Sequence, residues 1–576
     1  MKTFSGHLSP LAQAQAPKIP GAPEEPALDV REIQGSVLVG FNKDHQYFIF
    51  LEITKMDVTK RWLQLLVPRI ATTDETLAFR RLFRALRVRR GAEPTGMIAT
   101  WTNIAFSAEG IRKLTSQEEL EKFASASFKA GLAQQSRLLG DPTNPAAEGH
   151  PDKWVVGNTK KRPDILLLLA SDSLKVLKGE VKRIKEEIRA LQGAAPTRRS
   201  KAGLRIIYEQ AGENLPGDLG GHEHFGFKDG ISQPGVRGRV SQGAQDFLTP
   251  RLIDPADTAH ALRFAKPGQP LIWPGQFVLG YPLQDAHDDV KPVVPDETEP
   301  PWPAWARNGS FLVFRRLRQD VAGFWAFARA QSDLLKQKPG FQNMTPEHFA
   351  SLLVGRWPSG APVMRTPDKE IEPLGGSDIA SNNFRFSQDT EPMQLRADIH
   401  QTPDNFPQAT ADAGGMRCPY SAHIRKVNPR DDTTDLGGGR PTLQRRILRR
   451  GIAYGPPLEN PRTATDDGAD RGLLFLCYQA SIEDQFEFLS EHWANSTTLP
   501  KDYNRANQPA GHDLIIGESE GAAGRTRVLT LPGSDGSFET IQIPGDFIIP
   551  TGGDYFFTPS LTALKTVLAD GNRGTT

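Results

Sequence analysis

Cysteine is scarce in this sequence, with only Cys418 and Cys477 among 576 residues. Two thiols cannot build a disulfide framework or a cysteine-rich zinc site, so a hydrophobic core must hold the fold together. Long apolar runs are also missing, because no segment approaches the roughly 18 consecutive apolar residues of a membrane-spanning helix. The N-terminal stretch has no apolar core of the kind that a secretory signal needs. These absences predict a cytoplasmic protein that does not cross a membrane.

An excess of either charge is missing too. The chain has 69 basic and 68 acidic side chains, so its formal net charge is +1. This balance gives no electrostatic reason to expect nucleic acid or an anionic membrane as a partner. The composition, 38% hydrophobic and 24% charged, is typical of a globular protein, and the length exceeds what one hydrophobic core normally supports. We therefore expect two domains.

A short apolar strand, a polar break and an amphipathic helix follow one another four times along the chain. The expected strands are Tyr47–Ile53, Ile165–Leu169, and the segments that begin at Ser310 and Gly472. The expected helix N-caps are Asp57, Asp172 or Ser173, Asp320 and Ser481. Glu483 and Asp484 would lie in the first turn of the fourth helix, where acidic groups suit the helix dipole.

Two such units, with further strands between them, fit a split βαβ domain. The pattern predicts an α+β fold in which two ferredoxin-like domains follow one another. The expected divisions are a flexible arm over residues 1–30, a first domain over 31–238, a connecting segment over 239–268, a second domain over 269–566 and a tail over 567–576. Asp229 would lie near the boundary, and domain interfaces are favoured places for cofactor sites.

Three polar segments could carry chemistry. Asp229 lies in "HEHFGFKDGISQPG", where an Asp-Gly pair usually marks a turn and Lys228 could pair with the carboxylate at the surface. His423 lies in "CPYSAHIRKVNPR", and one of 12 histidines is more often a surface or core residue than a ligand. In "RRILRRGIAYGPP", four arginines fall within six residues, and Arg449 or Arg450 would need an anion if it were partly buried.

In this order, "GFKDGISQP", "HIRKVNPR" and "RILRRGIAYG" resemble the three active-site segments of dye-decolourising haem peroxidases. Further stretches resemble the same family, among them "IQGSVLVGFNKDHQYFIFLEI", "NGSFLVFRRLRQDV", "GRWPSGAP" and "LLFLCYQASIEDQFEFLSEHWAN". The resemblance extends from about Asp29 to the region of Phe557, which is nearly the whole chain. It is greatest to the larger class of the family, which fungal and bacterial members share.

The resemblance implies a role for each matching residue. His423 matches the proximal haem ligand, Asp229 the distal acid–base carboxylate, and Arg449 the distal arginine, with Arg450 as the alternative one residue along. Arg430 matches a basic group that contacts a haem propionate. Glu483, or else Asp484, is expected to accept a hydrogen bond from the second ring nitrogen of His423, since such partners raise the basicity of a ligand.

Leu474 and Leu476 share one face of the fourth strand and are expected to line the distal pocket. Relatives often have an aromatic residue at one of these positions, so Leu476 would leave the pocket roomier. Lys228 stands where an apolar residue is common in fungal relatives, and a cation within reach would lower the pKa of Asp229. Tyr454 is either a relay for electrons from bulky substrates or a packing residue.

The function that the resemblance implies is a peroxidase with one haem b per chain, mainly in the C-terminal domain. It would reduce hydrogen peroxide and oxidise dyes, phenols and other aromatic donors through a ferryl intermediate. The alternative is a protein that binds or handles haem without useful turnover, which would need His423 but no distal proton shuttle. The resemblance leaves open whether the chain forms a homo-oligomer.

Overall fold

The computed structural model describes residues 19–570 except 93, 95, 192–202, 297, 399–403, 501–510, 519–525 and 544. Residues 1–18 of the expected arm and 571–576 of the expected tail lie outside the described residues. Among the helices of the described residues, none is both long and apolar enough to cross a membrane.

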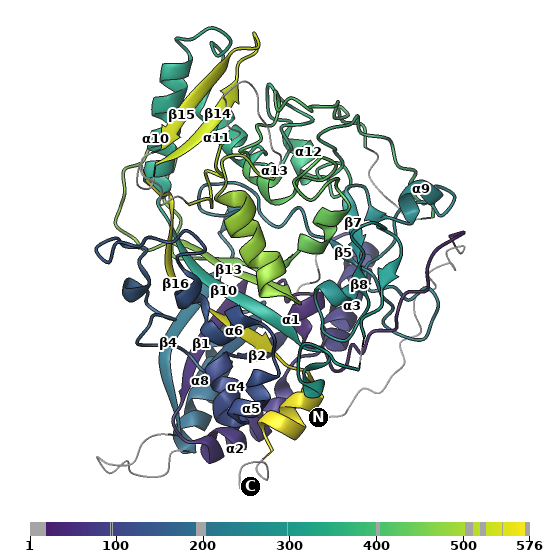
Figure 1. The fold of residues 1–576 in the computed structure, drawn as a ribbon, viewed down its shortest axis with the longest axis vertical. Helices are drawn as coiled ribbons and strands as arrows, with labels where there is room; N and C mark the ends of the chain where they lie inside the picture. The colour runs from purple at the N-terminus through teal and green to yellow at the C-terminus, as the bar shows by residue number, and fades with distance from the viewer. Residues whose placement is uncertain are drawn as a thin grey trace.

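The first half of the chain forms a ferredoxin-like unit (Figure 1). Its four strands are adjacent in the order β4-β1-β3-β2, and all of their pairings are antiparallel. This order places the first and third strands of the unit at its centre, which is the arrangement of a split βαβ motif. The elements are β1 (His45–Ile53), α2 (Met56–Leu66), α3 (Thr73–Arg90), β2 (Thr100–Phe106), β3 (Ile165–Ser171), α8 (Leu174–Ala190) and β4 (Leu204–Glu213).

The second half repeats the pattern. Here β16 and β13 flank β10, and β11 and β12 pair with the outer side of β13, so the order of strand types is the same as in the first half. The elements are β10 (Ser310–Gln319), α10 (Val321–Leu335), β11 (Leu448–Arg449), β12 (Ile452–Tyr454), β13 (Gly472–Gln479), the π-helical η7 (Ile482–Ala494) and β16 (Ile548–Thr558). The predicted α+β fold with two ferredoxin-like units is confirmed.

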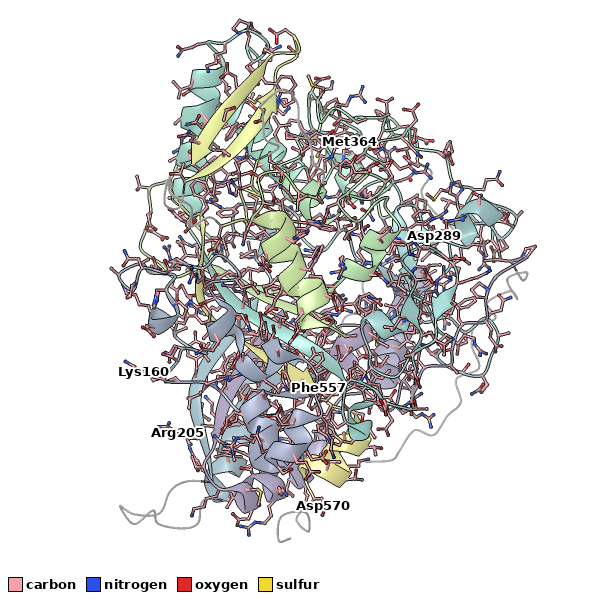
Figure 2. All side chains as sticks on the ribbon, in the orientation of Figure 1. Lys160, Arg205, Asp289, Met364, Phe557 and Asp570 are labelled. Carbon is pink, nitrogen blue, oxygen red and sulfur yellow. The ribbon has the colours of Figure 1, made fainter. Side chains whose placement is uncertain are left out.

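The two units meet edge to edge. Phe106 in β2 pairs with Phe557 in β16, which Figure 2 labels, and this contact joins all the strands into one nine-stranded sheet. Two hydrophobic clusters, one on each face, cross from one half to the other. One contains Ile49 with Val313 and Tyr555, and the other contains Phe50 with Phe314 and Leu476. The halves therefore share their cores.

Shorter elements surround the sheet. Those of the first half and the connecting region are α1 (Gly35–Leu38), α4 (Ala108–Leu114), α5 (Gln117–Glu121), α6 (Ala126–Ala130), α7 (Leu132–Gln135), β5 (Gly235–Val236), α9 (Thr258–Ala261), β6 (Phe264–Lys266), β7 (Gln269–Ile272), β8 (Leu283–Gln284) and β9 (Pro292–Val293). Those of the second half are α11 (Pro346–Val354), α12 (Glu372–Gly376), α13 (His423–Val427), β14 (Arg527–Pro532), β15 (Phe538–Ile543) and α14 (Leu561–Ala563). Figure 1 shows β14 and β15 beside α10, away from the first half.

Three of the four expected helix starts are confirmed. The side chains of Ser173, Asp320 and Ser481 each accept a backbone N–H in the first turn of the helix that follows. The expected N-cap Asp57 is wrong, because Lys55 occupies the N-cap of α2. Asp57 lies in the first turn instead and pairs with Arg61 at 3.2 Å.

The last residues of the expected flexible arm, from Glu25 onward, are packed against the rest of the protein. Glu25 is buried, and its carboxylate accepts hydrogen bonds from Arg251 at 2.6 and 2.8 Å and from the N–H of Gly238 at 2.6 Å. Leu28 and Val30 are buried in the core. This ion pair and the apolar contacts fix the segment from Glu25 onward. The other expected divisions, 31–238, 239–268 and 269–566, stay predictions, with β4 ending at Glu213 and β10 beginning at Ser310.

Candidate active site

Three segments far apart in the sequence meet beside β13. The first is the loop after β4 that carries Asp229, the second is the short helix α13 that begins at His423, and the third is β11, which ends at Arg449. A charge on His423 is close enough to lower the pKa of Asp229. The side chains of Asp229, Arg449 and His423 are 38%, 28% and 24% exposed. Each of these side chains is therefore partly accessible.

His423 is held by a buried carboxylate. Its Nδ1 lies 2.8 Å from Oδ2 of Asp513, whose side chain is fully buried. The other carboxylate oxygen of Asp513 accepts the N–H groups of Ile515 and Ile516 at 2.8 and 3.1 Å. Because the Asp513 carboxylate can only accept, Nδ1 of His423 carries a proton, and Nε2 is the ring nitrogen available to a ligand. Nε2 makes no hydrogen bond to any residue that the structure describes.

The expected partner of His423 is therefore wrong. Glu483 points toward the first half of the molecule, where its carboxylate accepts the hydroxyl of Ser125 at 2.7 Å and the N–H of Ser127 at 3.0 Å. Asp484, the second choice, pairs with Arg445 at 3.1 Å. Both residues belong to the first turn of η7, as expected, but that turn faces away from His423.

Asp229 and Arg449 form an ion pair. Nη1 of Arg449 donates to Oδ1 of Asp229 at 2.8 Å, and Nη2 lies 3.3 Å from the carbonyl of Ser232. Burial raises the pKa of Asp229, but the charge of Arg449, the N–H of Gly230 and the charge on His423 outweigh it, so the pKa lies below the ordinary value. Asp229 is thus an ionised carboxylate beside a fixed guanidinium, rather than a simple turn residue paired with Lys228.

Arg450 does not share this position. Its guanidinium donates to the carbonyls of Ser36, Val37 and Leu38 at 2.8–3.0 Å and so ties β11 to α1. Of the two arginines that the sequence left open, Arg449 is the one that faces Asp229.

The residues expected to line the pocket lie on the wrong face of β13. Arg449 is directly opposite Cys477 in the antiparallel pair, so its side chain shares a face with Cys477 and Phe475. Leu474 and Leu476 point to the other face, where both are fully buried in the core. Phe475 is therefore on the side of Arg449, together with Leu473 and Cys477. An aromatic ring is present on this side after all, and the expected extra room from Leu476 is not there.

Several arginines near this site form no ion pair within the described residues. Arg430 has a left-handed backbone (φ 54°) and donates to the carbonyls of Asn382 and Phe384 at 3.1 and 2.9 Å. Burial lowers the pKa of Arg430, the charges of Arg356 and Arg446 lower it further, and the charge of Asp431 opposes them. Burial also lowers the pKa of Arg356 to about 9 and that of Arg446 to about 10. No ion pair joins these three guanidinium groups to a carboxylate within the described residues.

This cluster fits an anionic cofactor. Nε of Arg446 is buried and has no hydrogen-bond partner among the described residues. A buried guanidinium without a counter-charge costs free energy that a bound anion would offset. An imidazole whose Nε2 is available as a ligand, near arginines that form no ion pair within the described residues, suits an iron porphyrin whose two propionates carry the negative charge.

Lys228 and Tyr454 lie apart from the reacting groups. The ammonium of Lys228 lies 3.4 Å from the carbonyl of Gly375, and the cation that lowers the pKa of Asp229 is Arg449. Tyr454 is only 2% exposed, and its ring packs 4.2 Å from the guanidinium carbon of Arg316. Of its two expected roles, this burial favours packing.

Asp513, Arg356 and Arg446 carry little local signal in the sequence. Asp513 is 90 positions from His423, and the only local sign is an aspartate directly before the apolar run "LII". Arg356 and Arg446 lie in segments that were singled out, "GRWPSGAP" and "RRILRRG", but their clustering depends on tertiary contacts.

Comparison with known proteins gives the site a context. The sequence model described as "DyP dimeric alpha+beta barrel domain" matches residues 32–198, and "Dyp-type peroxidase, C-terminal" matches residues 388–507. A dye-decolorizing peroxidase of Mycetinis scorodonius is 32% identical over 579 residues, which cover 97% of this chain and 92% of that protein. "Peroxidase 2" of the same fungus is 29% identical over 581 residues, with 99% and 94% covered.

Solved structures agree with these relatives. An ancestral D-type dye-decolorizing peroxidase superposes with a TM-score of 0.70 at 32% identity and covers 94% of this chain and all of its own. A variant of the dye-decolorizing peroxidase from Pleurotus ostreatus gives a TM-score of 0.71 at 28% identity, with 95% and 100% covered. The chain therefore belongs to the dye-decolourising peroxidases, haem enzymes that reduce hydrogen peroxide and oxidise dyes.

Proposed function

We propose that in this peroxidase His423 is the proximal haem ligand, Asp229 is the acid–base group and Arg449 is the distal cation. The observation that carries this assignment is the ion pair between Asp229 and Arg449 at 2.8 Å, close to a histidine whose Nε2 is free. Storage or transport of haem would need the histidine alone. The ion pair therefore favours turnover over the haem-handling alternative.

Arg430 and Arg446 would hold the two haem propionates. Neither forms an ion pair with a carboxylate of the described residues, and the buried Nε of Arg446 has no hydrogen-bond partner among them. When bound, the haem iron supplies the centre at which peroxide binds and through which electrons pass to it. Asp513 would keep His423 oriented and make its Nε2 more basic.

The residues on the distal side would move one proton. The Asp229 carboxylate accepts the proton from one peroxide oxygen and returns it to the other, which leaves as water. Arg449 donates hydrogen bonds to the negative charge that develops on the leaving oxygen, and its position is fixed before the reaction begins. Aromatic donors then supply the electrons that restore the enzyme.

The test is to replace Asp229 by Asn in the haem-loaded enzyme and follow the Soret band after rapid mixing with hydrogen peroxide. The rate should fall by about 100-fold or more, because general acid–base catalysis contributes roughly that much, while the haem content stays the same. Asp218→Asn is a matched control, since Asp218 is an exposed residue of the same segment after β4. An unchanged rate in Asp229→Asn would reject the assignment.

We also propose that the chain self-associates into a homo-oligomer. The support is the family description of residues 32–198, which names a dimeric α+β barrel domain. Light scattering coupled to size-exclusion chromatography should give a multiple of the 63.4 kDa chain mass, and a mass of one chain at all concentrations would contradict it.

A cytoplasmic location is the last part of the proposal. Its support is that both cysteines are buried and unpaired, so the fold does not depend on an oxidising compartment. Cell fractionation with an antibody against the protein should find it with cytoplasmic markers, and recovery from the culture medium would contradict the proposal.

A further inference from the structure

The loop that carries Asp229 is closed on itself by backbone hydrogen bonds. The N–H of Asp229 donates to the carbonyl of Gly221 at 3.0 Å, and the N–H of Glu223 donates to the carbonyl of Phe227 at 3.0 Å. The N–H of Gly226 completes the turn by donating to the carbonyl of Glu223 at 2.9 Å. Asp229 therefore stands at one end of a small closed loop whose shape decides where its carboxylate lies.

The side chain of Glu223 links the inside of this loop to the sheet. Its Oε2 accepts the N–H of Phe225 at 2.8 Å, and its Oε1 accepts the N–H of Phe227 at 2.9 Å. Nε2 of Gln319, at the end of β10, donates to the same Oε2 at 2.5 Å. One carboxylate thus satisfies two loop amides and binds the loop to a rigid strand.

Neighbouring residues anchor the same loop from other sides. Nε2 of the buried His224 donates to the carbonyl of Tyr454 in β12 at 2.8 Å, because the carbonyl can only accept. The ring of Phe225 stacks on Phe324 in α10 at 4.4 Å, and Nε1 of Trp325 donates to the carbonyl of Phe225 at 3.1 Å. The loop is therefore fixed to β10, α10 and the strand that follows Arg449.

The position of Glu223 is costly for stability. Burial and the charge of Asp229 raise the pKa of Glu223 to about 7, although its three hydrogen bonds oppose both effects. A raised pKa means that the ionised form destabilises the fold. Protonated Glu223 therefore contributes fully to the free energy of unfolding below its unfolded pKa of about 4.3. This contribution is lost as the pH rises through about 7. Residues that carry such a cost are expected at functional sites.

We propose that Glu223 is a positioning residue that holds Asp229 in register with Arg449. This inference rests on the proposed role of Asp229 and adds the group that sets its geometry. Glu223 does not touch the reacting atoms. It acts through the loop backbone, since a shift of about 1 Å in a reacting group can lower a rate about 100-fold.

The experiment compares Glu223→Gln with Glu209→Gln in the haem-loaded enzyme. Glu209 is a partly buried carboxylate of β4 that accepts the hydroxyl of Tyr47 at 2.6 Å, so it controls for the loss of a hydrogen-bonded Glu. In Glu223→Gln, an NH₂ group replaces one acceptor and faces an N–H. The rate of reaction with hydrogen peroxide should fall about 10- to 100-fold with the haem content unchanged, whereas Glu209→Gln should keep the wild-type rate.

A pH profile separates positioning from a general loss of structure. If Asp229 moves away from Arg449 in Glu223→Gln, its pKa loses the largest lowering influence, and the acid limb of the rate profile shifts to higher pH. Two other charges face Asp229. The charge of His423 is the same in the wild type and the variant, and the charge of Glu223 is removed by the substitution itself. Gln319→Met removes only the hydrogen bond from β10 to Glu223. It should lower the peroxide rate and move the acid limb to higher pH, both by less than Glu223→Gln does.

The outcomes distinguish this inference from the proposed function. A slow Asp229→Asn variant with a wild-type rate and acid limb in Glu223→Gln would overturn the inference alone. A wild-type rate in Asp229→Asn would overturn both. If Glu223→Gln does not retain haem, Gln319→Met decides, and an unchanged acid limb in that variant rejects the positioning role.

Discussion

Asp513 is the residue whose role on the proximal side can be tested most cleanly. It is the buried acceptor for Nδ1 of His423, and loss of such a partner typically costs about 10- to 100-fold in metal affinity or activity. We expect Asp513→Ala to release haem faster to an apo-globin acceptor. Glu483→Gln is the control, since Glu483 bonds to Ser125 and Ser127 instead. Faster haem loss in Glu483→Gln than in Asp513→Ala would restore the original expectation.

Arg449 should set the pH range of the peroxide reaction. The pKa of Asp229 lies below its ordinary value of about 3.9 because Arg449 opposes the effect of burial. The active carboxylate is therefore present above that pKa and is lost only as the pH falls through it. In Arg449→Met the largest influence opposing burial is lost, so the pKa of Asp229 rises and the acid limb should move to higher pH. Stopped-flow rates at several pH values measure this shift.

The matched control for this change is Arg445→Met. Arg445 is separated from Arg449 by four positions and pairs with the exposed Asp484. Its loss should leave the acid limb in place. An equal shift in both variants would mean that the effect comes from net charge rather than from the ion pair with Asp229.

At the scale of elements, the two faces of β13 have different roles: one packs in the core and the other faces the candidate site. Leu476 points into the core that both halves share and is fully buried. Leu476→Ala should therefore cost about 2–5 kcal/mol in the free energy of unfolding and leave the peroxide rate unchanged. Phe475→Leu, on the face of Arg449, should change the Soret spectrum of the haem-loaded enzyme with a smaller loss of stability. The reverse pattern in denaturant titrations and spectra would show that the assigned faces are wrong.

The elements that were predicted from the sequence are those with a local signal. The units at β3, β10 and β13 each join an apolar run to a capping residue, and Ser173, Asp320 and Ser481 cap as expected. The faces of β13 could not be predicted. In "LLFLC" both faces are apolar, so no alternation shows which side is which.

The site residues also divide into those with a local sequence signal and those that only tertiary contacts identify. The segments around Asp229, His423 and Arg449 were found because each forms a short stretch with a distinct composition. The choice between Arg449 and Arg450 depended on the pairing of Leu448 and Arg449 with β13, which no sequence pattern specifies. Asp513 was missed because its contact with His423 spans 90 residues.

On the scale of the whole molecule, the two repeated units should not unfold independently. They share both hydrophobic clusters, and the fully buried Phe557 lies where their sheets join. We expect calorimetry to show one transition for the haem-free protein. Phe557→Ala should lower the free energy of unfolding by about 3–5 kcal/mol and should not split the transition. Two resolved transitions in the wild type would contradict the shared core.

The central claim is that a haem lies with His423 on one side and with Asp229 and Arg449 on the other. A crystal structure of the haem-loaded enzyme tests it most directly. We predict a bond from the iron to Nε2 of His423, the Asp229–Arg449 pair over the opposite face, and Arg430 and Arg446 at the propionates. Iron held by a different residue, or Asp229 on the same face as His423, would contradict the account.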